Sequence, residues 1–415
     1  MHESTNKHTF PESREFSTRL ISQPIRRSFQ RVLKSLQYGT VELVWPDGKR
    51  TTHGAESDSN AGPRVTVTLH NYIAIRRLVL GGHNGFAEAY FEGHWSTTDL
   101  RAMFEIVMRN EQALKPVLAG KLLARVRDSL MHLNNRNSRA GSRRNIAFHY
   151  DLGNDFYSVW LDQSMTYSSA LYDSENHSLS TAQQNKIDRI SSLLSPTQDS
   201  RVLEIGCGWG ALGAALVEQT DCHVHGVSLS REQLDYARRT HTDSKLKFEF
   251  QDYREINGKY DHIVSIEMFE AVGMAYWKTY FDQLGKLLKS KGTVLLQTIT
   301  IEEDRFDSYR RNPDFIQRYV FPGGMLPTKE KLDELVSEAG FEIRQSEWFG
   351  KSYARTLAAW RDNFERRLSC IRELGYDEKF IRLWRYYLTY CETGFDRGTT
   401  DVGMLLLARR DGQPA

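Results

Sequence analysis

The run Val202-Leu203-Glu204-Ile205-Gly206-Cys207-Gly208-Trp209-Gly210 decides the fold of this chain. Its first four residues have the composition of a short buried strand, and three glycines follow at alternate positions. Glycine tolerates positive φ angles and close backbone approach, so the run predicts a tight turn that leads into a helix from Ala211. A second strand is expected over residues 222–227, with Ser230 as the N-cap of the next helix. Together these elements form a βαβ unit, whose ligands bind at the carboxyl ends of the strands.

The spacing of the glycines separates this turn from two common nucleotide-binding motifs. A dinucleotide turn has the pattern G-x-G-x-x-G and an acid near the end of the next strand, whereas here the pattern is G-x-G-x-G and Glu204 precedes it. The Gly-Lys-Ser/Thr triplet of a Walker loop does not follow these glycines. An acid before the turn suits a cation such as a methionine amino group. The pattern therefore resembles the first motif of class I S-adenosylmethionine-dependent methyltransferases, although a glycine turn alone is also compatible with a purely structural connection.

More specific runs lie on both sides of the turn. They are FHYDLGNDFY at 148–157, MTYSSA at 165–170, QDYR at 251–254, IVSIEMFEAVG at 263–273 and FPGGMLP at 321–327. In this order they resemble the cyclopropane fatty acyl phospholipid synthase family over most of the chain. The resemblance implies an α/β fold with a doubly wound, seven-stranded class I methyltransferase sheet and a smaller α+β domain at the amino end.

The length of 415 residues favours two domains. We predict an N-terminal domain over residues 1–120, which the resemblance associates with lipid, a linker over 121–144 and a methyltransferase domain over 145–415. The linker carries seven basic residues against one acid, Asp128. Such a segment can attract anionic lipid head groups, and a solvated linker is an equal alternative. No aromatic-interleaved basic pattern or helix-turn-helix accompanies it, so nucleic acid is not an expected partner.

Composition narrows the class of protein further. The net charge is +2 and 40% of residues are hydrophobic, as in ordinary globular proteins. The sequence has neither an apolar run of membrane-spanning length nor the apolar core of a signal peptide at its start. We therefore expect a cytoplasmic protein. If it acts on membrane lipid, it should associate with the inner face of the membrane. The cysteines, Cys207, Cys222, Cys370 and Cys391, show no C-x-x-C spacing, so neither disulfides nor a metal site is expected.

Periodicity predicts the remaining elements. The seven strands of the large sheet are expected at 202–205, 222–227, 246–250, 261–267, 293–299, 341–348 and 403–408. Two long helices are expected at 353–374 and 378–392. In the N-terminal domain we expect strands at 41–45 and 65–69, and helices at 25–36, 73–79, 85–91 and 100–107, with Gly81-Gly82 as a break.

The resemblance also assigns the cofactor site residue by residue. Tyr167 and Ser168 belong to the methionine end, Gly206, Gly208 and Gly210 to the turn beneath it, Ser228 and Gln233 to the ribose, and Asp252 and Tyr253 to the adenine. Glu204 is expected to order this network.

The expected chemistry is methyl transfer to an alkene. A sulfonium methyl is already an electrophile, so the enzyme has to align the acceptor, stabilise the resulting carbocation with aromatic faces and remove a proton to close a cyclopropane ring. The resemblance implies bicarbonate as the base, and Glu270, Tyr353 and the backbone of Ile299 match its binding residues. Two positions depart from the family: Ser169 stands in place of Cys and Gln297 in place of His. Both can still bind an anion, but the basicity of the site is in question.

The leading hypothesis is thus an S-adenosylmethionine-dependent enzyme that forms cyclopropane fatty acids on unsaturated acyl chains of membrane phospholipids. If deprotonation is impaired, a hydride shift and a redox partner would give a methyl branch instead. N-methylation of a small amine and a non-catalytic lipid-binding module are the other hypotheses. A homodimer is the expectation from the family.

Overall fold

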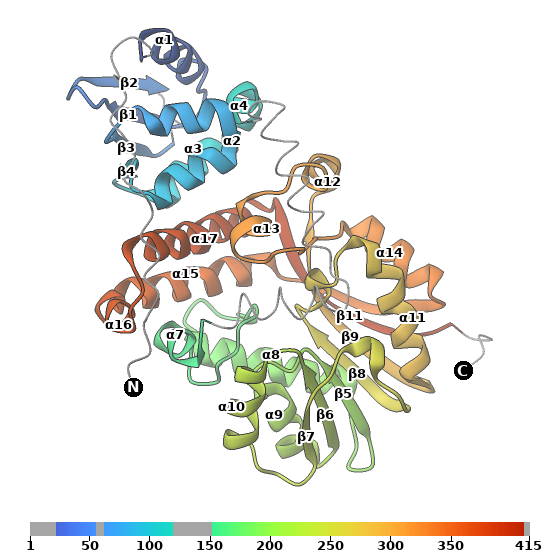
Figure 1. The fold of residues 1–415 in the computed structure, drawn as a ribbon. Helices are drawn as coiled ribbons and strands as arrows, with labels where there is room; N and C mark the ends of the chain where they lie inside the picture. The colour runs from blue at the N-terminus through green and yellow to red at the C-terminus, as the bar shows by residue number, and fades with distance from the viewer. Residues whose placement is uncertain (1–21, 55–61, 119–151, 411–415) are drawn as a thin grey trace, which may run out of the picture.

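The computed structural model describes residues 22–54, 62–118 and 152–410, which form two parts (Figure 1). The first is a small α+β domain, and the second surrounds a seven-stranded sheet. The expected basic linker at 121–144 and the motif residues 149–151 lie outside the described residues. The predicted fold class, a doubly wound seven-stranded sheet with a smaller N-terminal α+β part, is confirmed.

The large sheet has the strand order β10-β11-β9-β8-β5-β6-β7. Its strands are β5 (Arg201–Ile205), β6 (His223–Ser228), β7 (Leu246–Phe250), β8 (Tyr260–Ile266), β9 (Leu288–Ile301), β10 (Phe341–Trp348) and β11 (Thr400–Arg409). β11 pairs antiparallel with β9 and β10, and the other neighbours are parallel. The carboxyl ends of β5, β6, β8 and β9 consequently share one edge, where open α/β sheets bind their ligands.

Two hydrophobic cores cover the two faces of this sheet. Successive side chains of a strand point to opposite faces, so Val202 packs into one core and Leu203 into the other. The first core takes in α8 (Leu179–Leu194) and α9 (Ala211–Thr220), and the second takes in α11 (Trp277–Leu287) and α14 (Lys329–Glu338). The short helices are α7 (Asn154–Trp160), α10 (Arg231–Thr240), α12 (Glu303–Tyr309) and α13 (Phe315–Tyr319).

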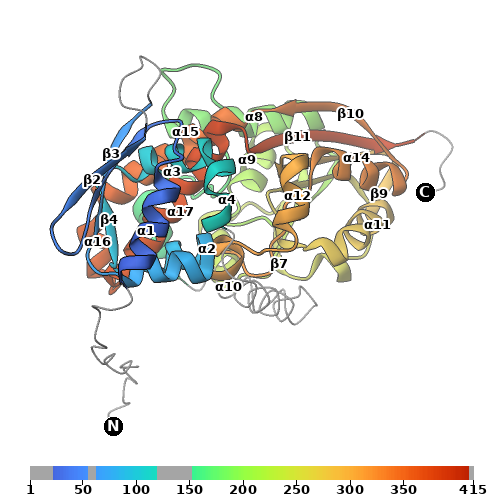
Figure 2. The same cartoon turned by 90° about the horizontal axis from the view of Figure 1, so that it is seen from above.

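Two long helices, α15 (Gly350–Arg366) and α17 (Glu378–Arg397), lie side by side between the sheet and the N-terminal domain (Figures 1 and 2). The expected single helix over 353–374 is wrong, because Arg367 leaves helical geometry (φ −112°, ψ 20°) and α16 (Leu368–Glu373) starts after it. α17 runs beyond its predicted end at 392 to a left-handed Gly398, a common helix stop.

The N-terminal domain has a four-stranded sheet of order β2-β1-β3-β4. Its elements are α1 (Ser22–Leu33), β1 (Thr40–Val44), β2 (Arg50–Gly54), β3 (Arg64–Leu69), α2 (Ile73–Phe91), β4 (Trp95–Thr97), α3 (Leu100–Arg109) and α4 (Glu111–Leu118). The two helices predicted around Gly81-Gly82 form α2, which is kinked at Gly82 (φ 58°, ψ −142°). Neither β2, a polar edge strand, nor β4, which has three residues, was predicted.

The two domains share a hydrophobic core. Phe91 of α2 and Phe104 of α3 both set their rings edge-on to Tyr386 of α17, at centroid distances of 5.4 and 4.7 Å. At the rim, Arg101 Nε donates to Glu392 Oε1 at 2.8 Å. The same core continues through α17 to one face of the large sheet, so the N-terminal domain is packed against the larger part (Figure 2). Among the described residues, no helix is both long and apolar enough to cross a bilayer.

Candidate active site

A cavity of about 380 Å³ opens at the carboxyl ends of the parallel strands. The predicted residues that line it are Tyr167, Ser168, Glu204, Gly206, Gly208, Ser228, Gln233, Asp252, Tyr253, Glu270, Ile299 and Tyr353. Gly210, Ser169 and Gln297 are not among the lining residues. Met108 of the N-terminal domain and Tyr387 of α17 also line the cavity. Residues that are distant in sequence and belong to both domains therefore face one cavity.

The glycine turn after β5 forms the floor of the cavity. Gly206, Gly208 and Gly210 have φ angles of 86°, 53° and 89°, which other residues rarely adopt. A Cβ on Gly206 would lie 2.9 Å from Cγ of Met268, in the turn after β8. Gly210 is the N-cap of α9, and a Cβ there would lie 2.8 Å from the Phe248 ring. The tight glycine turn predicted from the sequence is therefore confirmed, and its contact with a cofactor stays a prediction.

Two pairs of hydrogen-bonded side chains lie at the part of the cavity wall where the ribose and adenine are expected. Ser228, the last residue of β6, donates from Oγ to Gln233 Oε1 at 3.1 Å. Asp252 is buried, and Arg254 holds its carboxylate with Nε to Oδ1 at 2.8 Å and Nη2 to Oδ2 at 2.6 Å. These bonds fix Asp252 at the cavity wall, and its role toward an adenine stays a prediction.

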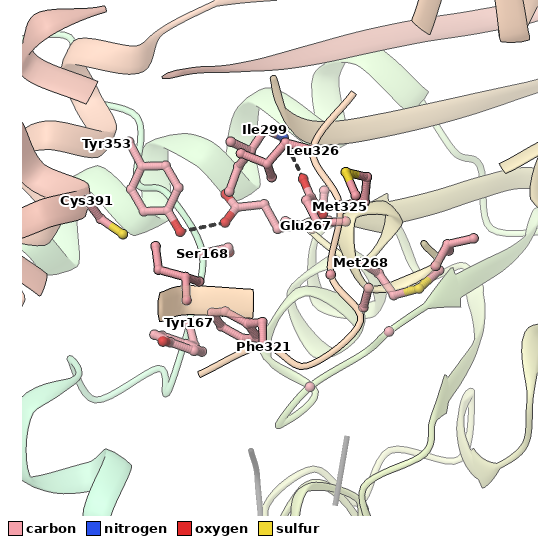
Figure 3. A pocket seen from close by; sticks show the side chains of 18 of the residues that line it. Tyr167, Ser168, Glu267, Met268, Ile299, Phe321, Met325, Leu326, Tyr353 and Cys391 are labelled. Atoms are coloured by element: carbon pink, nitrogen blue, oxygen red, sulfur yellow. Dashed lines mark hydrogen bonds between the residues drawn. The ribbon is translucent and has the colours of Figure 1, made fainter. Parts of the chain in front are cut away.

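Glu267, an acid without a predicted role, lies at the centre of the site (Figure 3). Its Oε1 accepts from the Ser169 backbone N–H at 2.8 Å and from Gln297 Nε2 at 2.7 Å, and its Oε2 accepts from the Tyr353 hydroxyl at 2.7 Å. Its φ of 49° is unusual for a residue with a side chain. The carboxylate of Glu267 therefore occupies three groups that were expected to bind an external anion.

Glu270 lies one turn further along the same loop. Its Oε1 accepts from the Ile299 backbone N–H and from Thr298 Oγ1, the latter at 2.8 Å. Its Oε2 is buried and has no hydrogen-bond partner among the residues that the structure describes. Glu270 is thus anchored by one oxygen and has the other available.

Burial sets the acidity of both groups. Loss of solvent raises the pKa of Glu267, against the opposing effect of its donors, of which Tyr353 is the strongest. Burial, followed by the neighbouring charge of Glu267, raises the pKa of Glu270 to about 7. A carboxyl group with a pKa near neutral pH is well suited to accept and release a proton.

The two substituted positions act differently from the expectation. The Ser169 hydroxyl donates to its neighbouring carbonyl, Ala170 O, at 3.0 Å, so only the backbone of Ser169 serves the site. Gln297 is fully buried behind Glu267. The expectation that these two side chains bind a bicarbonate is not met in this arrangement, because Glu267 takes the donors. The donor set does not fit an additional anion.

Sequence reasoning also missed Lys186 of α8. It lines the cavity, is 2% exposed and donates from Nζ to Ser168 Oγ at 2.7 Å. A lysine within the apolar stripe of an amphipathic helix, here among Ala182, Ile190 and Leu194, was the signal that could have found it. For Glu267, the signal was an acid at the end of a strand, three residues before Glu270.

Aromatic side chains surround the remaining wall. Tyr167 and Tyr387 join their hydroxyls at 3.1 Å, and the rings of Tyr353 and Phe395 lie 4.4 Å apart. Phe321, in the FPGG run, also lines the cavity (Figure 3). Such a wall accommodates an apolar ligand and can stabilise positive charge. Among the described residues, no group of His, Cys, Asp and Glu is placed to hold a metal ion.

The strand order, the glycine turn beneath the cavity and the acids at the ends of β5 and β8 define a class I S-adenosylmethionine-dependent methyltransferase. Residues 137–405 match the model of the family described as mycolic acid cyclopropane synthetase. The chain belongs to this family.

Proteins of known name are similar in sequence to most of this chain. It is 35% identical to the tuberculostearic acid methyltransferase of Mycobacterium tuberculosis over 388 residues, which cover 90% of this chain and 88% of the relative. It is 34% identical to the cyclopropane-fatty-acyl-phospholipid synthase of Escherichia coli K12 over 358 residues, covering 84% and 89%. A cyclopropane synthase structure from Mycobacterium tuberculosis superposes with a TM-score of 0.61 at 30% identity, covering 64% of this chain and 98% of that one.

Proposed function

We propose that this enzyme transfers the methyl group of S-adenosylmethionine to the double bond of an unsaturated acyl chain in a membrane phospholipid. Two relatives that match most of the chain are named for acyl-chain chemistry, one on phospholipid. The observation that carries the proposal is the pair of acids at the end of β8, facing an aromatic wall in one cavity. The aromatic rings can stabilise a cationic intermediate, and an acid can remove a proton from it.

In the proposed reaction, the sulfonium cofactor supplies an electrophilic methyl group. The new bond joins the methyl carbon to one alkene carbon, the sulfur–methyl bond breaks, and the positive charge is left on the other alkene carbon. Tyr167, Phe321 and Tyr353 present their rings to this charge. The free Oε2 of Glu270 takes the proton that the cation must lose, and the hydrogen bonds to Oε1 keep the carboxylate in place.

A cyclopropane is the first proposed product, formed when the added methyl group loses the proton to Glu270. Glu267 favours a second candidate, a methyl or methylene branch. Its carboxylate occupies the three donors that would hold an external base, so the proton has to go to Glu270, whose Oε1 already accepts two hydrogen bonds. Slower deprotonation gives a hydride shift time to move the cation before the proton leaves. A saturated methyl branch would further require a reducing partner protein.

The reaction is proposed to take place at the inner face of the membrane. The N-terminal domain and residues 121–144, which carry the basic run, are proposed to bring the cavity to anionic lipid, as a monomer or a homodimer. Deleting residues 1–120 is expected to abolish activity on vesicles. Retained activity on a soluble amine would support the small-amine hypothesis instead.

The test is a product analysis with purified protein, unsaturated phospholipid vesicles and labelled S-adenosylmethionine. Mass spectrometry of the released fatty acids should show a gain of one CH₂. Loss of the double bond indicates a cyclopropane, and a retained double bond indicates a methylene branch. No labelled fatty acid, with intact cofactor binding, would overturn the proposal.

A further inference from the structure

Lys186 is a buried cation that the acyl chemistry does not use. It projects from α8 into the cavity and is 2% exposed. Among the described residues, its one hydrogen-bond acceptor is Ser168 Oγ, at 2.7 Å, and no carboxylate lies within ion-pair distance of Nζ. Two of the three ammonium protons are thus left for another acceptor. Burying an unpaired charge is costly, so such a group indicates an anionic partner.

The second buried group in this corner is Glu204, at the end of β5. It is 4% exposed, lines the same cavity, and its Oε2 has no hydrogen-bond partner in the described part of the chain. Lys186 and Glu204 influence each other electrostatically, but they form no ion pair. Burial lowers the pKa of Lys186 to about 8, against the opposing charge of Glu267, and raises that of Glu204 to about 8, against the opposing effect of the Gly213 backbone N–H.

A zwitterion matches this pair of groups. The methionine end of S-adenosylmethionine carries an ammonium and a carboxylate on the same carbon. Ser168, which the resemblance assigns to that end, is the residue that Lys186 contacts. We infer that Lys186 binds the carboxylate of the methionine moiety together with Ser168, while Glu204 faces its ammonium group. The inference depends on the use of S-adenosylmethionine and not on the proposed acyl substrate.

A structural role for Lys186 has to be separated from this one. Gln183, one turn earlier on α8, donates from Nε2 to the carbonyl of Ser168 at 3.0 Å, so α8 holds the 166–168 segment at two points. Lys186 could have a purely structural role, as the second residue by which α8 holds this segment. The difference is chemical: a structural lysine affects every ligand of the pocket, whereas a carboxylate-binding lysine affects only ligands that carry a carboxylate.

The experiment is calorimetric titration with S-adenosylmethionine and its decarboxylated analogue, without lipid. Lys186→Met keeps the aliphatic stem and removes the charge. It should weaken binding of S-adenosylmethionine about 30-fold or more and leave the analogue within about 3-fold. Gln183→Leu, which loosens the same segment without removing a charge, should change both affinities by the same factor. Lys259→Met, at an exposed position, should change neither.

Equal losses for the two ligands in Lys186→Met would overturn the inference. If this variant does not fold, the wild-type protein decides: it must bind S-adenosylmethionine about 10-fold or more tightly than the decarboxylated analogue. Equal wild-type affinities would also overturn the inference. If the wild-type protein bound neither ligand, the cofactor assignment itself would be wrong, whereas failure of the acyl substrate would leave these titrations unchanged.

Discussion

Two turns at the same edge of the sheet do different work. The turn after β5 uses glycine backbones with positive φ, whereas the turn after β8 uses the carboxylates of Glu267 and Glu270. Met268 of the second turn lies next to Gly206 of the first. The first turn has to exclude side chains, and the second has to supply them. Cofactor binding and proton transfer are therefore expected to respond to separate substitutions.

The largest effect should come from Glu270→Gln. The amide cannot accept a proton, so turnover should fall at least about 100-fold, while the affinity for S-adenosylmethionine stays within a few-fold. Turnover is measured with unsaturated vesicles and affinity by calorimetry. Glu338→Gln, at an exposed position of α14, is the matched control. Unchanged turnover in Glu270→Gln would remove this residue from the mechanism.

Gly206→Ala should give the opposite pattern. The alanine would strain a backbone with φ 86° and bring Cβ to 2.9 Å from Met268 Cγ, so cofactor affinity should fall about 10-fold. Gly258→Ala is the control for backbone strain alone. Gly258 also has a positive φ, 102°, but no atom lies within 4 Å of the added Cβ. This variant should lower the melting temperature and leave affinity unchanged. Equal affinities in Gly206→Ala and wild type would contradict the role given to the turn.

The pH dependence distinguishes the two acids. Glu270 must be ionised to accept a proton, so kcat/KM should rise with pH through an inflection near its pKa of about 7. Since the charge of Glu267 raises that pKa, Glu267→Gln should move the inflection to lower pH by about one unit.

Tyr353→Phe should give a smaller shift in the same direction. The Tyr353 hydroxyl stabilises the charged form of Glu267, so its loss raises the pKa of Glu267 and leaves less negative charge beside Glu270. A shift to higher pH in either variant would show that the two carboxyls are not coupled in this way.

The smallest effect should be a partial rescue. In the double variant Gly206→Ala/Met268→Ala, the side-chain atom nearest to the added Cβ is gone, although Cβ of residue 268 remains at 3.0 Å. Cofactor affinity should recover about 2-fold to 3-fold over Gly206→Ala alone. Strict additivity of the two substitutions would show that the turns do not meet at this contact.

Much of the cofactor side was predictable because its determinants are local. The glycines, the strand before them and the Ser230 cap of α10 follow from residue preferences over a few positions. The resemblance placed Glu270 and Tyr353 correctly in the cavity.

The hydrogen-bond network around Glu267 was not predictable from motifs, because it depends on contacts across the fold. Glu267 had no assigned role, and only the packing of β9, α15 and the segment between α7 and α8 around the end of β8 brings Gln297, Tyr353 and Ser169 to its carboxylate. Lys186 was missed for the same reason. A helical period predicts that a position faces inward, but it does not predict which charged groups lie near it in the fold.

The aromatic contact between α3 and α17 has a consequence for how members of the family differ. The superposed cyclopropane synthase structure matches 98% of its own length within 64% of this chain, so it carries no counterpart of the remaining third. In a protein of that shorter kind, a tyrosine at the place of Tyr386 would face solvent, as would a carboxylate at the place of Glu392. The positions of Tyr386 and Glu392 should therefore pair with an N-terminal domain only in members that carry one, which makes them a sequence marker of domain loss or gain.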